Sequence, residues 1–338
     1  MEFGIGIDAS LGLTLAEQRA LVGEARDAGY AGAWTPSGPA TRDGFQVCGQ
    51  WAAQGLPVGI SVIPAPLWTV PSLAQQAGSL HEISEGRFTL GLGTGGIYGA
   101  EYRSTYGLPE WPVVTMMREY LGALRGLLAG ETVTLEGKVV RLRGLQVTGR
   151  PLAVPLYLAA LGPQMLALAG EVADGVCLNW TAPGMRAGVR ETIARGAGRR
   201  GRDPSAIRVT EYIRVCIDED EAKARRAFVR ALMPYALARA GASKDHGYRG
   251  HFRRMGFDAP LSHIEERHDA GAPAGELLDL FPEELLREVG YYGKAAGAPA
   301  ALARLSQGLD LAVVRIVGAQ PGIDAARAVL RACAPGAV

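Results

Sequence analysis

The chain has 338 residues, and its 35 Lys and Arg residues nearly balance its 34 Asp and Glu residues. This balance offers no electrostatic footprint for nucleic acid or for an anionic membrane, so neither is expected as a partner. The first twenty residues show no signal-peptide pattern, and no window reaches eighteen unbroken apolar residues. Four scattered cysteines without a C-x-x-C pair predict reduced, buried thiols. These features predict a soluble, cytoplasmic protein.

Short apolar runs alternate with longer amphipathic segments along most of the chain. Helices are expected over 13–29 and 71–86, each ending at a glycine. Eight runs have the composition of buried strands: 2–8, 31–36, 57–64, 87–93, 154–160, 174–180, 207–218 and 311–318. Such alternation over this length favours a (β/α)8 TIM barrel, formed as a single domain over residues 1–338.

Two segments interrupt this alternation. Residues 131–150 alternate polar and apolar side chains around Glu136 and Gly137, which predicts a β-hairpin. Residues 242–297 are richer in histidine, charge and glycine, and we expect a helical insertion there. The histidines of this insertion share neither a helical face nor a metal-ligand spacing, so no metal site is expected. A solvated surface is expected instead for its polar residues His246, His251, His263, His268, Asp245, Glu265, Glu266 and Asp269.

The segment RFTLGLGTGG, residues 87–96, matches the G-x-G-x-x-G spacing of a dinucleotide-binding loop. In a Rossmann fold that motif follows the first strand and opens a helix whose N-terminus meets the pyrophosphate. Here three strand–helix units come first, and helical periodicity resumes only at Val113. We therefore expect these glycines to give a ligand close access to the backbone at the end of the fourth barrel strand. A purely structural glycine turn is the alternative.

The third predicted strand is unusual because it places Ser61 in a buried run and is followed by Pro64, Pro66 and Pro71. Proline cannot continue a sheet, so the strand must end near Ile63 and leave by a fixed path. A polar strand end beside a glycine loop is typical of a ligand clamp.

Three segments in order resemble the luciferase-like monooxygenase superfamily, whose (β/α)8 enzymes use flavin or the deazaflavin F420. The first joins GISVIPAP to SEGRFTLGLGTGG at the third and fourth strands, and the second is the helix and hairpin over 117–142. The third, PLYLAALGPQMLALAGEVADGVCL over 155–178, resembles the family's phosphate loop after the fifth strand. The likeness extends over nearly the whole chain and is most specific over 57–180.

The resemblance implies a cofactor site at the ends of the third to fifth strands. Ser61 and Val62 would form a non-prolyl cis peptide behind the cofactor ring, and the ring edge or ribityl chain would contact Thr94, Gly95 and Gly96. The phosphate would lie against Ala159, Ala160, Leu161, Gly162, Pro163 and Gln164. The residues alone also favour an anion site there, because a helix follows the L-G-P-Q turn and its first amides attract negative charge.

One part of the family pattern is absent. Many F420-dependent members carry an Asp-His pair after the second strand, where this chain has Ser37 and Gly38. Asp8, directly after the first strand, is the first candidate for a catalytic acid or base, and a turn or cap carboxylate before Ser10 is the alternative. The candidates for the substrate pocket are Trp34, Ser37, Trp68 and Trp180, with plain core packing as the alternative for the tryptophans.

Two arginines, Arg214 and Arg315, lie within the late predicted strands. A buried guanidinium is unfavourable unless it is paired. A structural ion pair is the favoured interpretation, and a position at the mouth of the pocket is the alternative.

Together the motifs predict an F420-dependent oxidoreductase that transfers a hydride between the deazaflavin and a small organic substrate. An FMN-dependent luciferase-like monooxygenase, which would use reduced flavin and O2 with a reductase as its partner, is the first alternative. A non-catalytic flavin- or ligand-binding barrel is the second. The resemblance also implies a homodimer.

Overall fold

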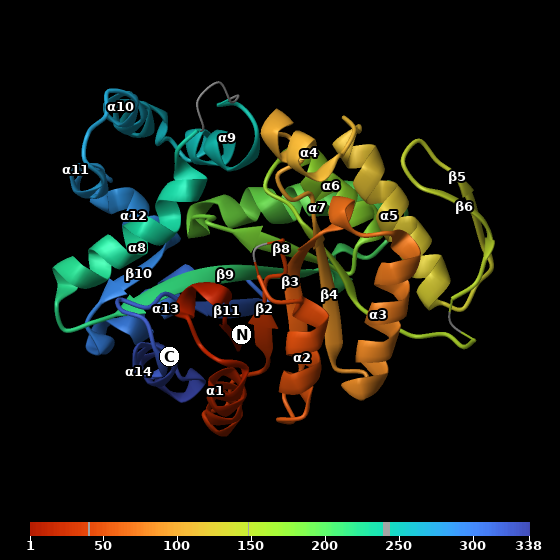
Figure 1. Cartoon of the computed structure of the whole chain (residues 1–338), viewed down its shortest axis with the longest axis horizontal. Helices are drawn as coiled ribbons and strands as arrows, with labels where there is room; N and C mark the ends of the chain where they lie inside the picture. The colour runs from red at the N-terminus through yellow and green to blue at the C-terminus, as the bar shows by residue number, and fades with distance from the viewer. Residues whose placement is uncertain (40, 148, 239–243) are drawn as a thin grey trace. The chain divides into compact units, whose positions relative to one another are not determined.

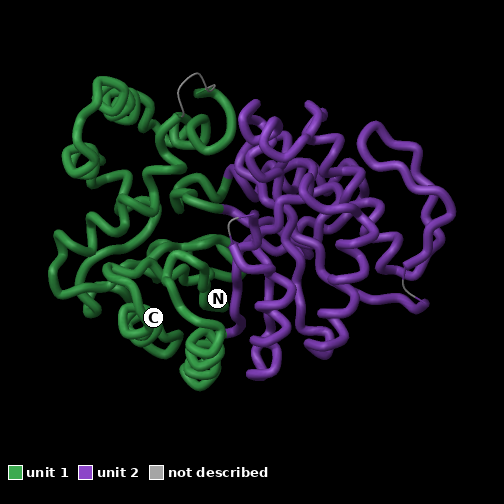
Figure 2. Tube along the Cα trace, in the orientation of Figure 1, with its two compact units in different colours: residues 1–30, 179–187, 211–338 green, residues 31–178, 188–210 purple. Residues whose placement is uncertain are grey.

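The computed structural model describes residues 1–39, 41–147, 149–238 and 244–338. The described residues group into two compact units, which Figure 2 colours separately. Unit 1 comprises residues 1–30, 179–187 and 211–338, and unit 2 comprises residues 31–178 and 188–210. Each unit is built from segments far apart in sequence. The single domain expected over 1–338 stays a prediction.

Unit 2 carries the central strands. They are β2 (Ala33–Thr35), β3 (Val58–Pro64), β4 (Phe88–Gly93), β7 (Leu156–Ala159) and β8 (Gly175–Asn179), whose last residue belongs to unit 1. Neighbours in this series pair in parallel. The crossovers that parallel pairing requires are helices: α2 (Gly44–Ala52), α3 (Val70–Ile83), α5 (Val113–Leu128) and α6 (Pro163–Val172), with the short α4 (Ala100–Tyr106) before α5 and α7 (Arg186–Gly198) after β8. Figure 1 shows α2 and α3 alongside β3 and β4.

Unit 1 carries the first and last strands of the chain. They are β1 (Glu2–Gly6), β10 (Gly290–Gly293), β11 (Leu311–Ile316) and β9 (Arg208–Ile217), which begins in unit 2. β1 pairs in parallel with β11, and β10 pairs in parallel with β9. Outside the segment 242–297, the α-helices of this unit are α1 (Leu15–Asp27), α8 (Glu221–Ala236), α13 (Ala298–Leu305) and α14 (Ile323–Ala332).

The eight predicted strands are all present, as β1, β2, β3, β4, β7, β8, β9 and β11. Their parallel pairing and the helices between them are those of a (β/α)8 barrel, which confirms the predicted fold class. β10 was not predicted, because GYYG is only four residues long and its glycines interrupt any apolar pattern.

Local capping explains where the predicted helices begin. Thr14 accepts a hydrogen bond from the amide of Glu17 at 3.2 Å, and the Glu17 carboxylate accepts one from the amide of Thr14 at 2.7 Å. This capping box starts α1. The Thr69 hydroxyl caps α3 by accepting a single hydrogen bond from the amide of Ser72, and Gly86 follows that helix with φ of +80°. Both helices confirm their predicted segments to within a few residues.

The predicted hairpin is β5 (Val133–Glu136) paired antiparallel with β6 (Arg141–Leu145). Residue 148 of the predicted segment lies outside the described residues. The Glu119 carboxylate on α5 accepts hydrogen bonds from the turn amides of Lys138, Val139 and Val140 at 2.8–2.9 Å. Figure 1 shows the hairpin beside α5, where this carboxylate anchors its turn.

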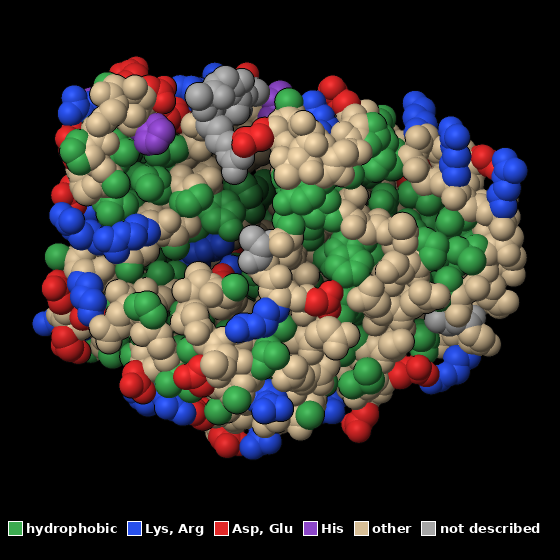
Figure 3. Space-filling model, in the orientation of Figure 1, with side chains coloured by type: hydrophobic (Ala, Val, Ile, Leu, Met, Phe, Trp, Pro, Cys, Tyr) green, Lys and Arg blue, Asp and Glu red, His purple; other side chains and the backbone are tan. Residues whose placement is uncertain are grey.

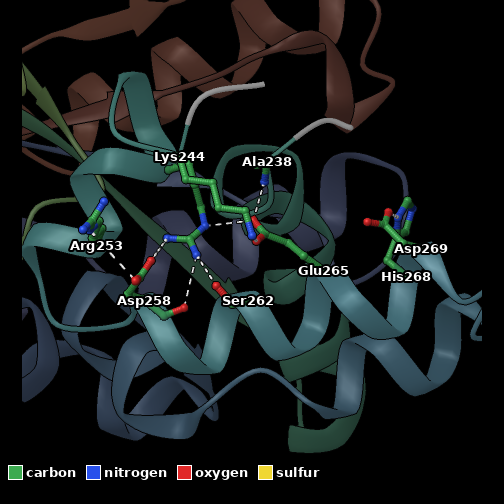
Figure 4. Close-up of polar contacts among 9 residues, drawn as sticks. Ala238, Lys244, Arg253, Asp258, Ser262, Glu265, His268 and Asp269 are labelled. Carbon is green, nitrogen blue, oxygen red and sulfur yellow. Dashed lines mark hydrogen bonds and ion pairs between the residues drawn. The ribbon is translucent and has the colours of Figure 1, made fainter. Parts of the chain in front are cut away.

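The insertion expected over 242–297 is helical up to residue 289, and its residues 242 and 243 lie outside the described ones. The helical prediction is wrong for its end, where Gly290–Gly293 form strand β10. The helices are α9 (Gly247–Arg254), α10 (Asp258–Asp269), α11 (Ala274–Asp279) and α12 (Glu283–Val289). Arg249 of α9 holds two of these helices together, donating to Glu265 at 2.8 Å and to Ser262 at 3.1 Å. In Figure 4 the side chains of Asp258, Ser262 and Glu265 point from α10 toward this guanidinium.

The solvated surface predicted for the polar residues of the insertion is wrong for two of them. Glu265 is 6% exposed and His251 is 1% exposed. Glu265 is buried because Arg249 and Lys244 pair with it, and the His251 ring is buried because it hydrogen-bonds to a main-chain carbonyl. The others are exposed as predicted: Asp245, His246, His263, Glu266, His268 and Asp269.

The surface carries mixed charge. On the face shown in Figure 3, acidic and basic side chains are interspersed and no extended area of one sign is seen. Within the described ranges, no helix combines the length and the apolar character that a membrane span needs.

Candidate active site

The residues expected to hold a cofactor follow three adjacent parallel strands of unit 2. β4 pairs with β3 on one side and with β7 on the other. The strand ends converge at Gly93, where an added Cβ would lie 2.5 Å from Cγ2 of Val62 and 3.5 Å from Cβ of Ala159. The structure therefore brings the three predicted segments, 61–62, 94–96 and 159–164, to one edge of the sheet.

The peptide bond between Ser61 and Val62 is cis, as the family resemblance implied. The register between β3 and β4 shifts between Ile60 and Ile63, which forms a bulge at this bond. The amide of Ser37 donates a hydrogen bond to the Val62 carbonyl at 3.3 Å. The segment after β2 thus supports the bulge through its main chain, at the position where the family's Asp-His pair is absent.

The glycines of 87–96 serve two different purposes. A Cβ at Gly91 would lie 2.6 Å from the Ile60 carbonyl oxygen, and one at Gly93 would meet Val62, so both make room for the β3 bulge. The structural alternative therefore accounts for the missing side chains of these two, and clearance for a ligand at Gly91 and Gly93 stays a prediction. An added Cβ at Gly95 or at Gly96 would lie 2.7 Å from Tyr102 of α4, but both glycines are exposed, so part of their backbone is open to a ligand.

The turn from β7 into α6 has the features of an anion cradle. Gly162 is the N-cap of α6 in an extended conformation, and no side chain caps the first amides of the helix. An added Cβ at Gly162 would meet no atom within 4 Å, so the space in front of the helix is open. Uncapped helix amides beside open space suit a phosphate. The residues present therefore fit the phosphate end of a deazaflavin or a flavin.

The thiol of Cys177 on β8 lies behind the bulge of β3. It hydrogen-bonds with Ser61 and Thr210, but burial is the dominant influence and raises the pKa of the Cys177 thiol. The side chain is therefore a neutral, unreactive thiol at neutral pH. All four cysteines are free and buried, which confirms that prediction.

The pocket candidates in unit 2 are packed against protein. The Trp34 ring occupies the space above Gly59, where an added Cβ would lie 2.3 Å from it, and it is 6% exposed. The hydroxyl of buried Ser37 accepts a hydrogen bond from the Gly44 amide at 3.2 Å, at the start of α2. Trp68 is half-buried with its edge against Phe45. The packing of Trp34 agrees with the alternative of a core role. A role in the substrate pocket stays a prediction for Trp34, Ser37 and Trp68.

Asp8 has the cap geometry that was the alternative to a catalytic role. Its carboxylate accepts a hydrogen bond from the Ser10 amide at 2.9 Å and forms an ion pair with Arg315 of β11. Burial alone would raise the pKa of Asp8, but Arg315 and Ser10 together hold it below its usual range. The carboxylate is therefore ionised at neutral pH and has no proton to donate. The ion pair predicted for Arg315 is confirmed.

Trp180, directly after β8, is fully buried and has φ of +58°. Few residues other than glycine adopt this conformation. His251 lies with Nε2 2.9 Å from the Trp180 carbonyl oxygen, so Nε2 carries the proton and donates. Burial lowers the pKa of His251 to about 4, which keeps the ring neutral.

The guanidinium of Arg214 on β9 lies 3.7 Å above the Trp180 ring. It donates a hydrogen bond to Oδ1 of Asn179 at 2.5 Å, and the Asn179 amide in turn donates to the Tyr248 hydroxyl at 2.6 Å. Sequence reasoning named Trp180 and Arg214 separately and missed Tyr248. No local sequence pattern predicts that these residues are in contact, because Tyr248 belongs to the helical insertion, far from β8 and β9 in the sequence.

The chain belongs to the luciferase-like monooxygenase family, whose model matches residues 1–309. The family and the predicted resemblance are thereby confirmed. Among its relatives, the 5,10-methylenetetrahydromethanopterin reductase of Methanolobus tindarius is 34% identical over 251 residues, 73% of this chain and 72% of that protein. The F420-dependent glucose-6-phosphate dehydrogenase of Beutenbergia cavernae is 34% identical over 181 residues, 50% of this chain and 52% of that protein.

Solved structures share the fold over nearly the whole chain. The coenzyme F420-dependent tetrahydromethanopterin reductase from Methanopyrus kandleri superposes with a TM-score of 0.77 at 24% identity, covering 98% of this chain and 97% of that one. The oxygenating constituent of 3,6-diketocamphane monooxygenase from Pseudomonas putida, in complex with FMN, gives 0.64 at 17% identity, covering 99% and 98%. The same fold therefore occurs in an enzyme dependent on F420 and in one that binds FMN.

Proposed function

We propose that this protein is an F420-dependent oxidoreductase that transfers a hydride between the deazaflavin and a small organic substrate. One observation carries the proposal. The β3 bulge at Ser61 and Val62, the exposed glycines 95 and 96, and the uncapped N-terminus of α6 lie together at the ends of three adjacent strands of unit 2. The relatives that are reductases and F420-dependent dehydrogenases support this choice of cofactor.

Each segment would have a separate task. The bulge at Ser61 and Val62 would support the ring from behind, and Thr94 with the two exposed glycines would contact the ring edge or the chain. Residues 159–164 would hold the phosphate through the amides at the start of α6. F420, when bound, supplies the hydride chemistry itself. The protein contributes binding and orientation of the cofactor.

Asp8 would act on charge rather than as a proton donor, because its ion pair with Arg315 keeps it ionised. A neutral donor would have to come from the substrate or from another group. We also propose a cytoplasmic homodimer, as the family resemblance implies. The FMN-dependent monooxygenase, with a reductase partner, shares this fold and is the competing function.

Titration of the pure protein with F420 and with FMN, followed by cofactor fluorescence, tests the proposal. We expect saturable binding of F420 that is at least tenfold tighter than that of FMN, a difference of about 1.4 kcal/mol. Tighter binding of FMN, with O2 consumption by the reduced complex, would establish the monooxygenase instead. Binding of a cofactor without turnover of any substrate would favour the non-catalytic barrel, and binding of neither would overturn both enzyme functions.

A further inference from the structure

We propose that Arg214 forms, within unit 1, a binding site for an anionic group on the substrate, of the carboxylate, phosphate or sulfonate class. The inference rests on the proposed function, because it specifies the substrate of that oxidoreductase.

Among the described residues, the buried arginines are paired with carboxylates, and Arg214 is the exception. Four of the described arginines, all in unit 1, are buried: Arg186, Arg214, Arg249 and Arg315. Arg186 pairs with Glu211 at 2.9 Å, Arg249 with Glu265 at 2.8 Å, and Arg315 with Asp8. Arg214, 3% exposed, makes no ion pair with any described residue, and its one hydrogen bond is to the neutral amide of Asn179.

The charge around Arg214 is therefore unbalanced. Arg315 is the charged group that affects Arg214 most strongly. Two carboxylates, Asp8 and Glu211, also interact with Arg214, but each is already paired with another buried arginine, Asp8 with Arg315 and Glu211 with Arg186. Burial first, and then repulsion by Arg315, lower the pKa of Arg214 to about 10, so the guanidinium is still charged at neutral pH. A buried charge without a counter-ion is unfavourable. An incoming anion would supply the missing counter-charge.

The guanidinium is held in place with some of its donors unused. Its central carbon lies 3.7 Å from the centre of the Trp180 ring and 5.4 Å from the centre of the Tyr235 ring. Asn179, fixed by the Tyr248 hydroxyl, accepts from Nη1. The other nitrogens of Arg214 donate to no described residue. They are not fully buried, so they can still be reached from solvent. A rigid guanidinium edge with free, accessible donors matches the planar geometry of a carboxylate or phosphate.

The position in the fold agrees with a substrate site. Arg214 lies near the carboxyl end of β9, and Asn179 is the last residue of β8. In (β/α)8 enzymes the active site is formed at the carboxyl ends of the barrel strands. Trp180, which lies against the guanidinium, has a left-handed backbone conformation. This conformation is rare for a bulky residue, and where it occurs it is often at a functional site.

The alternative is that Arg214 serves only to pack against Trp180. Replacement by methionine separates the two roles, because Met keeps the apolar stem and contact with the ring but removes the charge. Arg214→Lys keeps the charge but loses the planar fork. Arg230→Met is the matched control, since Arg230 is an exposed arginine on α8 of the same unit.

The full-length protein and its variants would be titrated with benzoate, inorganic phosphate and methanesulfonate at constant ionic strength, with binding followed by calorimetry. We expect millimolar or tighter binding of at least one anion, weakened at least tenfold in Arg214→Met, partly retained in Arg214→Lys and unchanged in Arg230→Met. The three probes distinguish the carboxylate, phosphate and sulfonate classes. Anion binding that is equal in Arg214→Met and in the natural protein would overturn the inference.

Two further measurements keep the test decisive. Benzamide, the neutral counterpart of benzoate, should bind at least tenfold more weakly to the natural protein, and equal binding would overturn the proposal even if Arg214→Met fails to fold. F420 affinity should be the same in Arg214→Met as in the natural protein, because the proposed cofactor residues lie in unit 2. If F420 binds and no anion depends on Arg214, this inference fails alone. If F420 does not bind at all, the proposed function fails.

Discussion

The carbonyl oxygen of Trp180 lies 2.9 Å from Nε2 of His251, so a neutral buried histidine holds the strained residue that follows β8. His251 is 1% exposed, and burial is the main reason that its pKa falls to about 4. This relationship makes the stability of the protein depend on pH in a defined window.

We expect the free energy of unfolding to decrease as pH falls from about 6.5 to about 4. In that window the unfolded chain protonates His251 and the folded chain does not, so acid favours unfolding; the full effect is at most about 3 kcal/mol. Urea denaturation at pH 7 and pH 4.5 measures it. His251→Gln keeps a donor without titration and should flatten this dependence, whereas exposed His263→Gln should not. An unchanged pH dependence in His251→Gln would contradict the assignment.

The ion pair between Asp8 and Arg315 predicts a large loss of stability in Asp8→Asn. Removing the carboxylate leaves Arg315 buried without a counter-ion, which should destabilise the fold by about 3–5 kcal/mol. Asp8→Asn combined with Arg315→Met should recover part of that loss. The control is Asp27→Asn, which breaks the exposed pair with Arg26 and should change stability by less than about 1 kcal/mol. Chemical denaturation would measure all four proteins, and equal effects at Asp8 and Asp27 would refute the prediction.

The Asp8 pair also stabilises the protein in a defined pH range. Because the pKa of Asp8 is lowered in the folded state, its contribution is present above the ordinary value of 3.8 and is lost as pH falls below it. The difference in unfolding free energy between the natural protein and Asp8→Asn should therefore shrink in this acid range. A constant difference down to pH 2 would show that the carboxylate is not the titrating group.

The open N-cap of α6 predicts opposite effects on stability and on cofactor binding. Gly162→Asp and Gly162→Asn can both cap the helix, and each should raise stability by about 0.3 kcal/mol. Asp also places a negative charge where the phosphate would lie, so F420 affinity should fall at least about tenfold in Gly162→Asp and much less in Gly162→Asn. Equal F420 affinity in the two variants would place the phosphate elsewhere.

The contact between Val62 and Gly93 predicts that Gly93→Ala disturbs the β3 bulge. The new Cβ would lie 2.5 Å from Cγ2 of Val62, which should destabilise the fold by about 1–3 kcal/mol and weaken F420 binding. Adding Val62→Ala should restore stability, since it removes the clashing group. Gly49→Ala on α2 is the control, because its Cβ would meet only Leu80 at 3.9 Å. It should be neutral or stabilising. Additive effects of Val62→Ala and Gly93→Ala would disprove the contact.

Much of the fold could be predicted from local patterns. Each barrel strand is a short apolar run because both of its faces are buried, so the strands can be predicted from the sequence. The hairpin over 131–150 and the helices over 13–29 and 71–86 show their own periodicity and capping residues. The cis peptide at Ser61–Val62 and the luciferase-like family were predicted from motif resemblance, since a short segment carries that signal.

The candidate site could be predicted only in part. The segments 61–62, 94–96 and 159–164 were found because each follows a predicted strand. The close contacts of Gly91 and Gly93 could not be predicted from the sequence. The atoms that leave no room for a side chain at these glycines belong to another strand. The same holds for His251, whose partner is a carbonyl 71 residues away.

The sequence by itself determined where the strands and helices lie, which family the chain belongs to, and which segments are suited to a cofactor. These properties depend on residues close together in the chain. Only the tertiary structure decided which charges are neutralised. Arg315 pairs with Asp8 across 307 residues, whereas Arg214, also on a buried strand, pairs with no carboxylate of the described residues. Side-chain partners depend on how distant segments pack, and no local periodicity encodes that packing.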